Sequence, residues 1–121
     1  MMTATTVEQY GEIVFEDTAN SFSNATVYVN LLDTSRADAP SSKIAEQVLR
    51  NVSYVSNSHH NITFYLKAII NDPKGRYTVS VHVDINNNGR VDKGDFINMQ
   101  SYPVVVRNKP NHVSILVKQI K

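Results

Sequence analysis

Residues 77–83 read Tyr-Thr-Val-Ser-Val-His-Val, and this stretch decides the fold class. Val79, Val81 and Val83 alternate with polar residues, so an extended chain here has one apolar and one polar side. Successive side chains of a β-strand point to opposite faces of the sheet, and a period of two is typical of a strand with one buried face. The stretch therefore predicts a half-buried β-strand.

The same alternation recurs on both sides of residues 77–83. Turn-favouring residues from Asn71 to Gly75 precede them, so Leu66 and Val79 are expected on consecutive antiparallel strands. Residues 41–52 fit helical as well as strand spacing, and we interpret them as a strand. The other predicted strands are residues 12–16, 26–31, 61–67, 96–100, 102–107 and 113–118. Seven or eight strands with short connections predict an all-β fold, an antiparallel β-sandwich of Ig-like type.

The apolar phase of these strands gives the expected core. The inward-facing residues are Ile13, Phe15, Val27, Val29, Leu31, Ile62, Phe64, Leu66, Val79, Val81, Val83, Val104, Val106, Val113, Ile115 and Val117.

Length and composition are those of one globular domain. The chain has 121 residues, of which 41% are hydrophobic and 19% charged, which suits a single core. We expect a flexible N-terminal segment over residues 1–9 and one β-sandwich domain over residues 10–121. The formal net charge of +1 gives no field that would attract a nucleic acid, and no apolar stretch approaches the ~20 residues of a transmembrane helix. The sequence leaves the oligomeric state open.

Two further features bear on the compartment. The sequence has no cysteine, which excludes disulfides, thiolate metal sites and a lipid anchor on cysteine in the chain as given. Residues 1–10 contain neither a basic segment nor an apolar run, so they are not a secretory signal. If residue 1 is the native start, the protein is expected in the cytoplasm.

An acidic loop at residues 84–95 carries the pattern with the clearest chemistry. Oxygen-bearing side chains occupy its first, third, fifth, ninth and twelfth positions, with Gly89 at the sixth and Val91 at the eighth, as in the EF-hand calcium loop. A hard cation binds six to eight oxygens at ~2.3–2.6 Å, and a chain that curls around it aims every second side chain inward. The pattern predicts Ca²⁺ in an EF-hand-like loop between two strands. The expected ligands are Asp84, Asn86 and Asn88 through their side chains, Arg90 through its backbone carbonyl, Asp92 directly or through water, and Asp95 as the closing ligand.

The alternative is a polar hairpin loop without metal, in which Asn and Gly supply left-handed turn conformations and the aspartates are solvated. The joint agreement of the ligand positions with Gly89 and Val91 favours the metal site. Asp95 is shorter than the usual glutamate at the twelfth position, which predicts a weaker affinity.

Other candidate residues are weaker. His59 and His60 lie in a loop rich in Ser and Asn without a carboxylate nearby in sequence, so solvated side chains are favoured over a metal site. His82 falls on the outward phase of its strand and is expected at the surface. The sequence contains no G-x-S-x-G elbow, glycine-rich phosphate loop or H-E-x-x-H motif, so we do not expect an enzyme.

Four stretches resemble the YbaY/YscW family of small bacterial β-sandwich proteins. They are Val-Asn-Leu-Leu-Asp-Thr-Ser-Arg-Ala-Asp-Ala-Pro at 29–40, Ile-Ala-Glu-Gln at 44–47, Gly-Arg-Tyr at 75–77 and Gln-Ser-Tyr-Pro-Val at 100–104. The resemblance implies a transthyretin-like sandwich and a periplasmic or cell-envelope location, since members are often outer-membrane lipoproteins. It also implies a secretin-like protein partner, because some members are pilotins, small chaperones that escort a secretin subunit. The sequence departs from this pattern in lacking a signal peptide and a lipidated cysteine.

Three functions follow from these observations. The favoured one is a non-enzymatic, calcium-binding module that binds a protein or peptide in the manner of a pilotin or chaperone. The second is a purely structural domain with a polar loop and no metal. The third is a metal-dependent enzyme in which Asp84, Asp92 and Asp95 hold a catalytic ion, although a fully wrapped loop leaves little room for an open coordination position.

Overall fold

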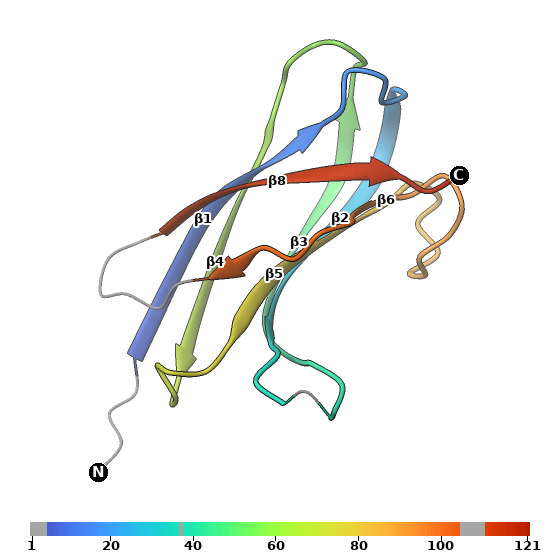
Figure 1. Cartoon of the computed structure of the whole chain (residues 1–121). Coiled ribbons are helices and arrows are strands. Elements are labelled where there is room, and N and C mark those ends of the chain that lie inside the picture. The colour runs from blue at the N-terminus through green and yellow to red at the C-terminus, as the bar shows by residue number, and fades with distance from the viewer. Residues whose placement is uncertain (1–4, 37, 105–110) are drawn as a thin grey trace.

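The computed structural model describes residues 5–36, 38–104 and 111–121, which form eight strands and no helix (Figure 1). No helix in these ranges is therefore long and apolar enough to cross a membrane. The strands are β1 (Thr5–Phe15), β2 (Phe22–Asp33), β3 (Ser42–Tyr54), β4 (Ile62–Ile70), β5 (Tyr77–Asp84), β6 (Phe96–Asn98), β7 (Pro103–Val104) and β8 (Asn111–Gln119).

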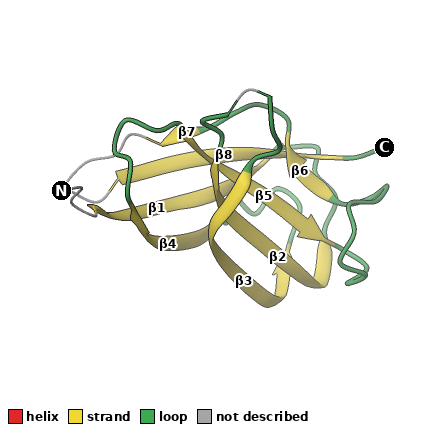
Figure 2. Cartoon of the chain, turned by 90° about the horizontal axis from the view of Figure 1, so that it is seen from below, coloured by secondary structure: helices red, strands yellow, loops and turns green. Residues whose placement is uncertain are grey.

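The strands form one strongly curved sheet in the order β3-β2-β5-β6-β8-β1-β4, and β7 pairs with β5. Among the described residues, β1 and β8 are parallel and the other paired strands are antiparallel. Figure 2 shows β1, β4 and β8 grouped apart from β2, β3 and β5. The two edge strands of the sheet, β3 and β4, lie close to each other. The Tyr65 amide of β4 donates a 2.8 Å hydrogen bond to the Gln47 side chain of β3. The sheet is therefore nearly closed into a barrel.

This architecture confirms the predicted all-β class and corrects its arrangement. The chain is not a plain antiparallel sandwich of two separate sheets, since the single sheet is mixed and β6 and β8 connect its two halves. β4 pairs with β1 and β5 pairs with β2, so the consecutive strands that carry Leu66 and Val79 do not form a hairpin. Alternation along a strand shows which face is buried, but it contains no information about the neighbouring strand or its direction.

The N-terminal boundary also differs from the expectation. β1 begins at Thr5, so residues 5–9 are strand and not part of a flexible segment. Val7 is 2% exposed and Gln9 is 1% exposed, and the Gln9 side-chain amide donates to the Tyr10 carbonyl. Alternation of apolar residues did not predict this part of the strand, because the inward-facing Gln9 is polar.

The core lies on the concave face of the curved sheet. Most of the predicted inward residues are buried, while Ile62, Val104 and Val113 are partly buried against the core, and Val106 lies outside the described residues. Further buried apolar residues that the alternation did not predict are Val7, Ala19, Ala25, Tyr54, Ala68, Ile70, Tyr77 and Phe96.

The convex face of β2 and β5 positions the functional site. In the β2–β5 register Tyr28 lies opposite His82 and Asn30 opposite Ser80, so these four outward side chains form one polar patch. β5 ends at Asp84 and β6 begins at Phe96, and the two strands pair through Val83 and Phe96. The loop between them therefore leaves and rejoins the sheet beside the patch.

Candidate functional site: the acidic loop and the adjoining pocket

The C-terminal end of the acidic loop is held to the sheet by backbone hydrogen bonds. Gly94 donates to the Ile120 carbonyl and Ile120 donates to the Asp95 carbonyl, each at 2.8 Å. Because Ile120 directly follows β8, these bonds join the end of the loop to the end of the chain's last strand. The base of the loop is thus part of the sheet.

Asp84, the first residue of the loop, is fully buried. Its Oδ2 accepts a 2.7 Å hydrogen bond from the Gly89 amide, which lies in a left-handed conformation at φ 76°. Its Oδ1 is also buried and has no hydrogen-bond partner among the described residues. Burying a carboxylate oxygen without a donor is unfavourable, so this atom is suited to a cation that supplies the missing interaction.

Asp95, the last residue of the loop, is buried and accepts several hydrogen bonds. Its Oδ1 accepts from the Ile85 amide at 3.0 Å, and its Oδ2 accepts from the Asp92 amide at 3.1 Å. His82 Nε2 lies 2.8 Å from the same Oδ2. Asp95 therefore closes the loop on itself through two backbone amides and fastens it to β5 through the imidazole.

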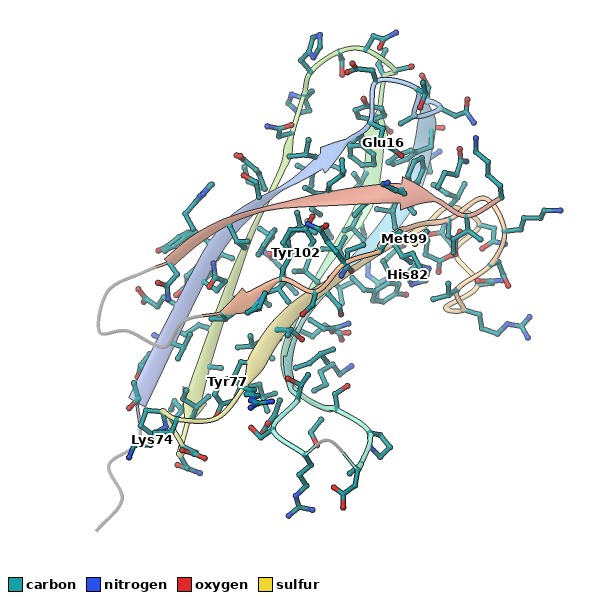
Figure 3. All side chains as sticks on the ribbon, in the orientation of Figure 1. Glu16, Lys74, Tyr77, His82, Met99 and Tyr102 are labelled. Atoms are coloured by element: carbon teal, nitrogen blue, oxygen red, sulfur yellow. The ribbon has the colours of Figure 1, made fainter. Side chains whose placement is uncertain are left out.

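His82 is the residue that the sequence did not assign to this site. Its side chain points outward from β5 as predicted, but the loop covers it and leaves it only 15% exposed. Figure 3 places it beside the base of the loop, away from Tyr77 at the other end of β5. One ligand atom each from His82, Asp84 and Asp95 lies within 4.8 Å of the other two. Strand phase alone gave no signal for this contact, because it does not show what covers the outward face.

Asn86, Asn88 and Asp92 form a second, more exposed group. The side-chain amides of Asn88 and Asn86 both donate to Asp92 Oδ2, the latter at 3.5 Å. Hydrogen bonds from Asn88 and then Asn86 lower the pKa of the Asp92 carboxyl below its ordinary value. Asn88 Oδ1 accepts from the Arg90 amide at 2.9 Å. The predicted side-chain ligands thus meet in two groups, and the structure does not show an EF-hand loop.

The tip of the loop is attached to β2 independently of these carboxylates. Asn87 Nδ2 donates to the Asn24 carbonyl at 2.8 Å, and the Thr26 hydroxyl donates to Asn87 Oδ1 at 2.6 Å. Asn87 itself has φ 56°, a conformation that asparagine tolerates better than most residues. The loop is therefore anchored at its tip and at its base.

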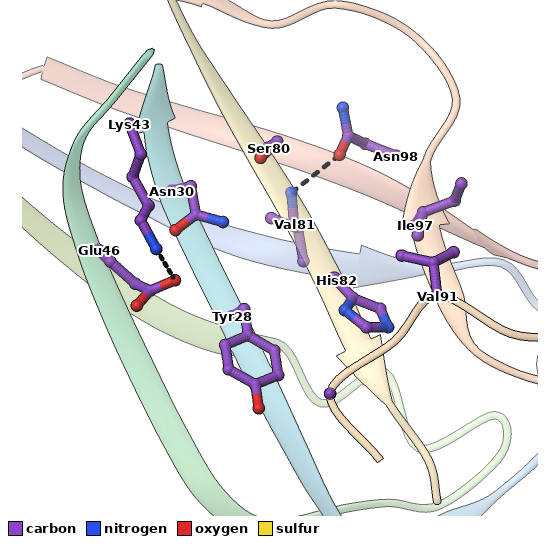
Figure 4. Close-up of a pocket in the computed structure, with 11 residues that line it drawn as sticks. Tyr28, Asn30, Lys43, Glu46, Ser80, Val81, His82, Val91, Ile97 and Asn98 are labelled. Carbon is purple, nitrogen blue, oxygen red and sulfur yellow. Dashed lines mark hydrogen bonds and ion pairs between the residues drawn. The ribbon is translucent and has the colours of Figure 1, made fainter. Parts of the chain in front are cut away.

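A pocket of about 640 Å³ lies on the convex face next to the loop (Figure 4). The outward side chains of Tyr28, Asn30, Ser80 and His82 form its floor, and the Tyr28 and His82 rings stack with centroids 5.7 Å apart. On the β3 side the wall contains Lys43 and Glu46, which form a 3.1 Å ion pair. The opposite wall consists of Gly89 and Val91 from the loop and Ile97 and Asn98 from β6.

The pocket combines apolar surface with an unsatisfied acceptor. Val91 is 56% exposed, and Tyr28 and Ile97 are half-buried. Asn30 Oδ1 is buried and has no hydrogen-bond partner within the described part of the chain. Pockets of this size bind ligands through apolar contacts, with a few polar groups that fix their orientation.

The two weaker candidates, His59 and His60, lie in the loop between β3 and β4, and both are exposed. The structure does not bring them to the acidic loop, which is joined to β5 and β6.

Comparisons with known proteins give one family match and one structural match. A family model described as "Type III secretion system lipoprotein chaperone (YscW)" matches residues 4–117. A search of curated proteins found no match. Among solved structures, an alternative pilotin from the type II secretion system of Vibrio cholerae is similar with a TM-score of 0.70 and 23% sequence identity. That alignment covers 98% of this chain and 99% of the pilotin, and at this identity it shows a shared fold.

Proposed function

Because the chain belongs to the YscW family of type III secretion system lipoprotein chaperones, we propose that it is a pilotin-like chaperone that binds a segment of a secretin subunit. The observation that carries this proposal is the family match over residues 4–117, which includes β1 to β7 and all of β8 except its last two residues. It also confirms the resemblance seen in the sequence. A chaperone of this kind works by binding and not by catalysis, and its place of action is the cell envelope.

The pocket beside the acidic loop is the surface that we assign to the partner. Its floor and loop wall offer apolar contacts from Tyr28, Val91 and Ile97, and Asn30 and Ser80 add polar groups to the floor. A volume of about 640 Å³ suits one or two large apolar side chains of a bound peptide. The expected partner is therefore a peptide with apolar anchor residues.

We expect saturable binding of synthetic peptides from the C-terminal region of the secretin subunit of the same organism. Val91→Ser should weaken binding about tenfold, since losing the burial of one valine side chain corresponds to roughly 1.5 kcal/mol. Val55→Ser is the matched control, because Val55 is 67% exposed and lies outside the pocket. Fluorescence anisotropy of labelled peptides measures both. If no peptide binds to protein shown to be folded, the purely structural role is the better description.

We propose further that the acidic loop binds Ca²⁺. The observation in support is Asp84 Oδ1, a buried carboxylate oxygen without a partner in the described residues. Asn86, Asn88, Asp92, Asp95 and the Arg90 carbonyl would supply the other oxygens, after the two asparagine amides turn to present oxygen instead of nitrogen. The set is rich in hard oxygen donors, which favours calcium over softer metals.

Calcium should raise the melting temperature of the protein by roughly 10 °C. An ion at 100 times its Kd stabilises the native state by ~2.7 kcal/mol, and each kcal/mol corresponds to about 4 °C for a domain of this size. Magnesium should have a smaller effect, because it requires a tighter octahedral shell and retains its waters. Thermal unfolding followed by circular dichroism, in EDTA and in millimolar calcium, measures the shift.

Asp84→Ala should abolish most of this rise, because it removes the unpaired oxygen and one of three negative charges. Asp17→Ala is the control, since Asp17 is an exposed acid in the turn between β1 and β2 and should leave the calcium effect intact. Equal melting temperatures in EDTA and calcium for the unmodified chain would mean that the loop is only a polar turn.

A further inference from the structure

We propose that the acidic loop and the pocket are one unit, in which a calcium ion at the loop fixes the pocket wall and so controls peptide binding. This inference rests on the two proposals above and adds the coupling between them. It follows from a set of contacts that the loop and the pocket share.

The loop wall of the pocket is bonded directly to the two buried carboxylates. Gly89 lines the pocket, and its amide donates to Asp84 Oδ2. Val91 also lines the pocket, and the next residue, Asp92, donates its amide to Asp95 Oδ2. Any displacement of either carboxylate therefore moves the main chain that forms this wall.

His82 belongs to the pocket floor and to the loop at the same time. Its ring stacks on Tyr28 with an interplanar angle of 19°, and its Nε2 lies 2.8 Å from Asp95 Oδ2. Figure 4 shows the imidazole between the floor and the segment that carries Val91. The imidazole thus links the position of the Asp95 carboxylate to the aromatic pair on the floor.

Repulsion between the Asp84 and Asp95 carboxylates makes the compact arrangement of the loop depend on a bound cation. Asp84 and Asp95 are both buried, and a ligand atom of each lies within 4.8 Å of the other. Two carboxylates at this separation repel each other, and the repulsion is stronger in the protein interior than in water. A divalent cation reverses the interaction, so the compact loop is favoured when the ion is bound.

The part of the loop that responds to the ion is limited by the Asn87 anchor. Asn87 is bonded to Asn24 and Thr26 of β2, and none of these three residues is an expected ligand. The backbone from Asn88 to Asp92 lies between this anchor and Asp95. This segment contains both loop residues of the pocket wall, so ion binding acts where a peptide would make contact.

A wall fixed before the peptide arrives lowers the ordering cost of binding. Because the coupling is reciprocal, a bound peptide must tighten calcium binding by the same factor by which calcium tightens peptide binding. We expect a factor of at least ten for a secretin-derived peptide.

The test uses the full chain, labelled with ¹⁵N and freed of divalent ions with EDTA. Calcium chloride should shift the amide signals of residues 88–92 together with those of Tyr28, Ser80 and His82, with one shared saturation curve. The peptide Kd, measured by anisotropy, should be at least tenfold lower in calcium than in EDTA. Asp84→Asn should make that Kd insensitive to calcium, whereas Asp17→Ala should leave the tenfold difference.

The variant His82→Phe tests the role of the imidazole separately from ion binding at the loop. Phenylalanine keeps a ring against Tyr28 but removes the hydrogen bond to Asp95, so calcium should still shift residues 88–92 while the shift at Tyr28 and part of the tenfold effect are lost. A variant that retains the full effect would overturn the role of His82.

The remaining outcomes distinguish the coupling from the functions on which it rests. Equal peptide affinity in calcium and EDTA, with calcium shifts confined to the loop, would overturn the coupling and leave both functions standing. The absence of any calcium shift would overturn the coupling and the ion site but not peptide binding. If no peptide binds in either buffer, the chaperone function and its control by calcium are both wrong.

Discussion

Replacing Phe96 with alanine should lower the free energy of unfolding by about 3–5 kcal/mol, as large-to-small changes of buried aromatic residues do. Phe96 is 1% exposed and meets the Phe15 ring edge-on at 5.3 Å and the Phe22 ring at 5.5 Å. Alanine would leave a cavity among these rings that the surrounding strands cannot fill. Urea unfolding in EDTA, followed by circular dichroism, measures the loss.

The same change should also weaken the proposed calcium binding, because Phe96 immediately follows Asp95, the last residue of the acidic loop. The calcium-induced rise in melting temperature is therefore expected to be smaller in Phe96→Ala than in the unmodified chain. Met99→Ala is the control, since Met99 is 57% exposed just beyond β6 and its truncation should change stability by less than about 0.5 kcal/mol. A loss below 1 kcal/mol for Phe96→Ala would contradict the packing described here.

Gly11→Val should destabilise the protein by roughly 3 kcal/mol or more, at the upper end of overpacking effects. Gly11 lies in the middle of β1, opposite Phe64 on β4 and Val113 on β8. A Cβ at this position would overlap the Phe64 ring and the Val113 backbone carbonyl. The ring can shift, but the carbonyl belongs to the parallel pairing of β1 and β8 and has no room to move.

Urea unfolding again measures the effect, with Thr6→Val as the control in the same strand. Thr6 is exposed, and exchanging one β-branched residue for another there should change stability by less than about 0.5 kcal/mol. Adding Phe64→Leu to Gly11→Val should recover only part of the loss, because the Val113 carbonyl remains in place. Full recovery would show that the ring alone excludes a side chain at Gly11.

Regular alternation made much of the fold predictable from sequence. Val79, Val81 and Val83 are buried as expected, because a strict period of two fixes which side of a strand faces the core. The ambiguous residues 41–52 also form a strand, β3. The pairing of β1 with β8 was not predictable, since a parallel pair between the first and last strands depends on contacts between residues 102 apart, such as Glu12 and Ser114.

The candidate site was predictable in its position and less so in its contacts. The twelve-residue pattern correctly places a loop between the end of β5 at Asp84 and the start of β6 at Phe96. It gave no indication that Asp84 and Asp95 would be buried beside His82. Nor did it indicate that Asn86, Asn88 and Asp92 would form a separate group. Loop spacing describes the order of ligands along the chain, whereas their convergence depends on how the loop lies against the sheet.

The parallel pairing of β1 with β8 also determines how a tethered molecule would be oriented. β1 contains 11 residues, so its two ends are roughly 33 Å apart at about 3.3 Å per residue. The acidic loop is bonded to Ile120, at the end of the molecule toward which both strands run (Figure 1). A lipid attached ahead of Thr5 would hold the opposite end against a bilayer. The acidic loop and its pocket would then face away from the membrane surface, within reach of a partner that approaches from the aqueous side.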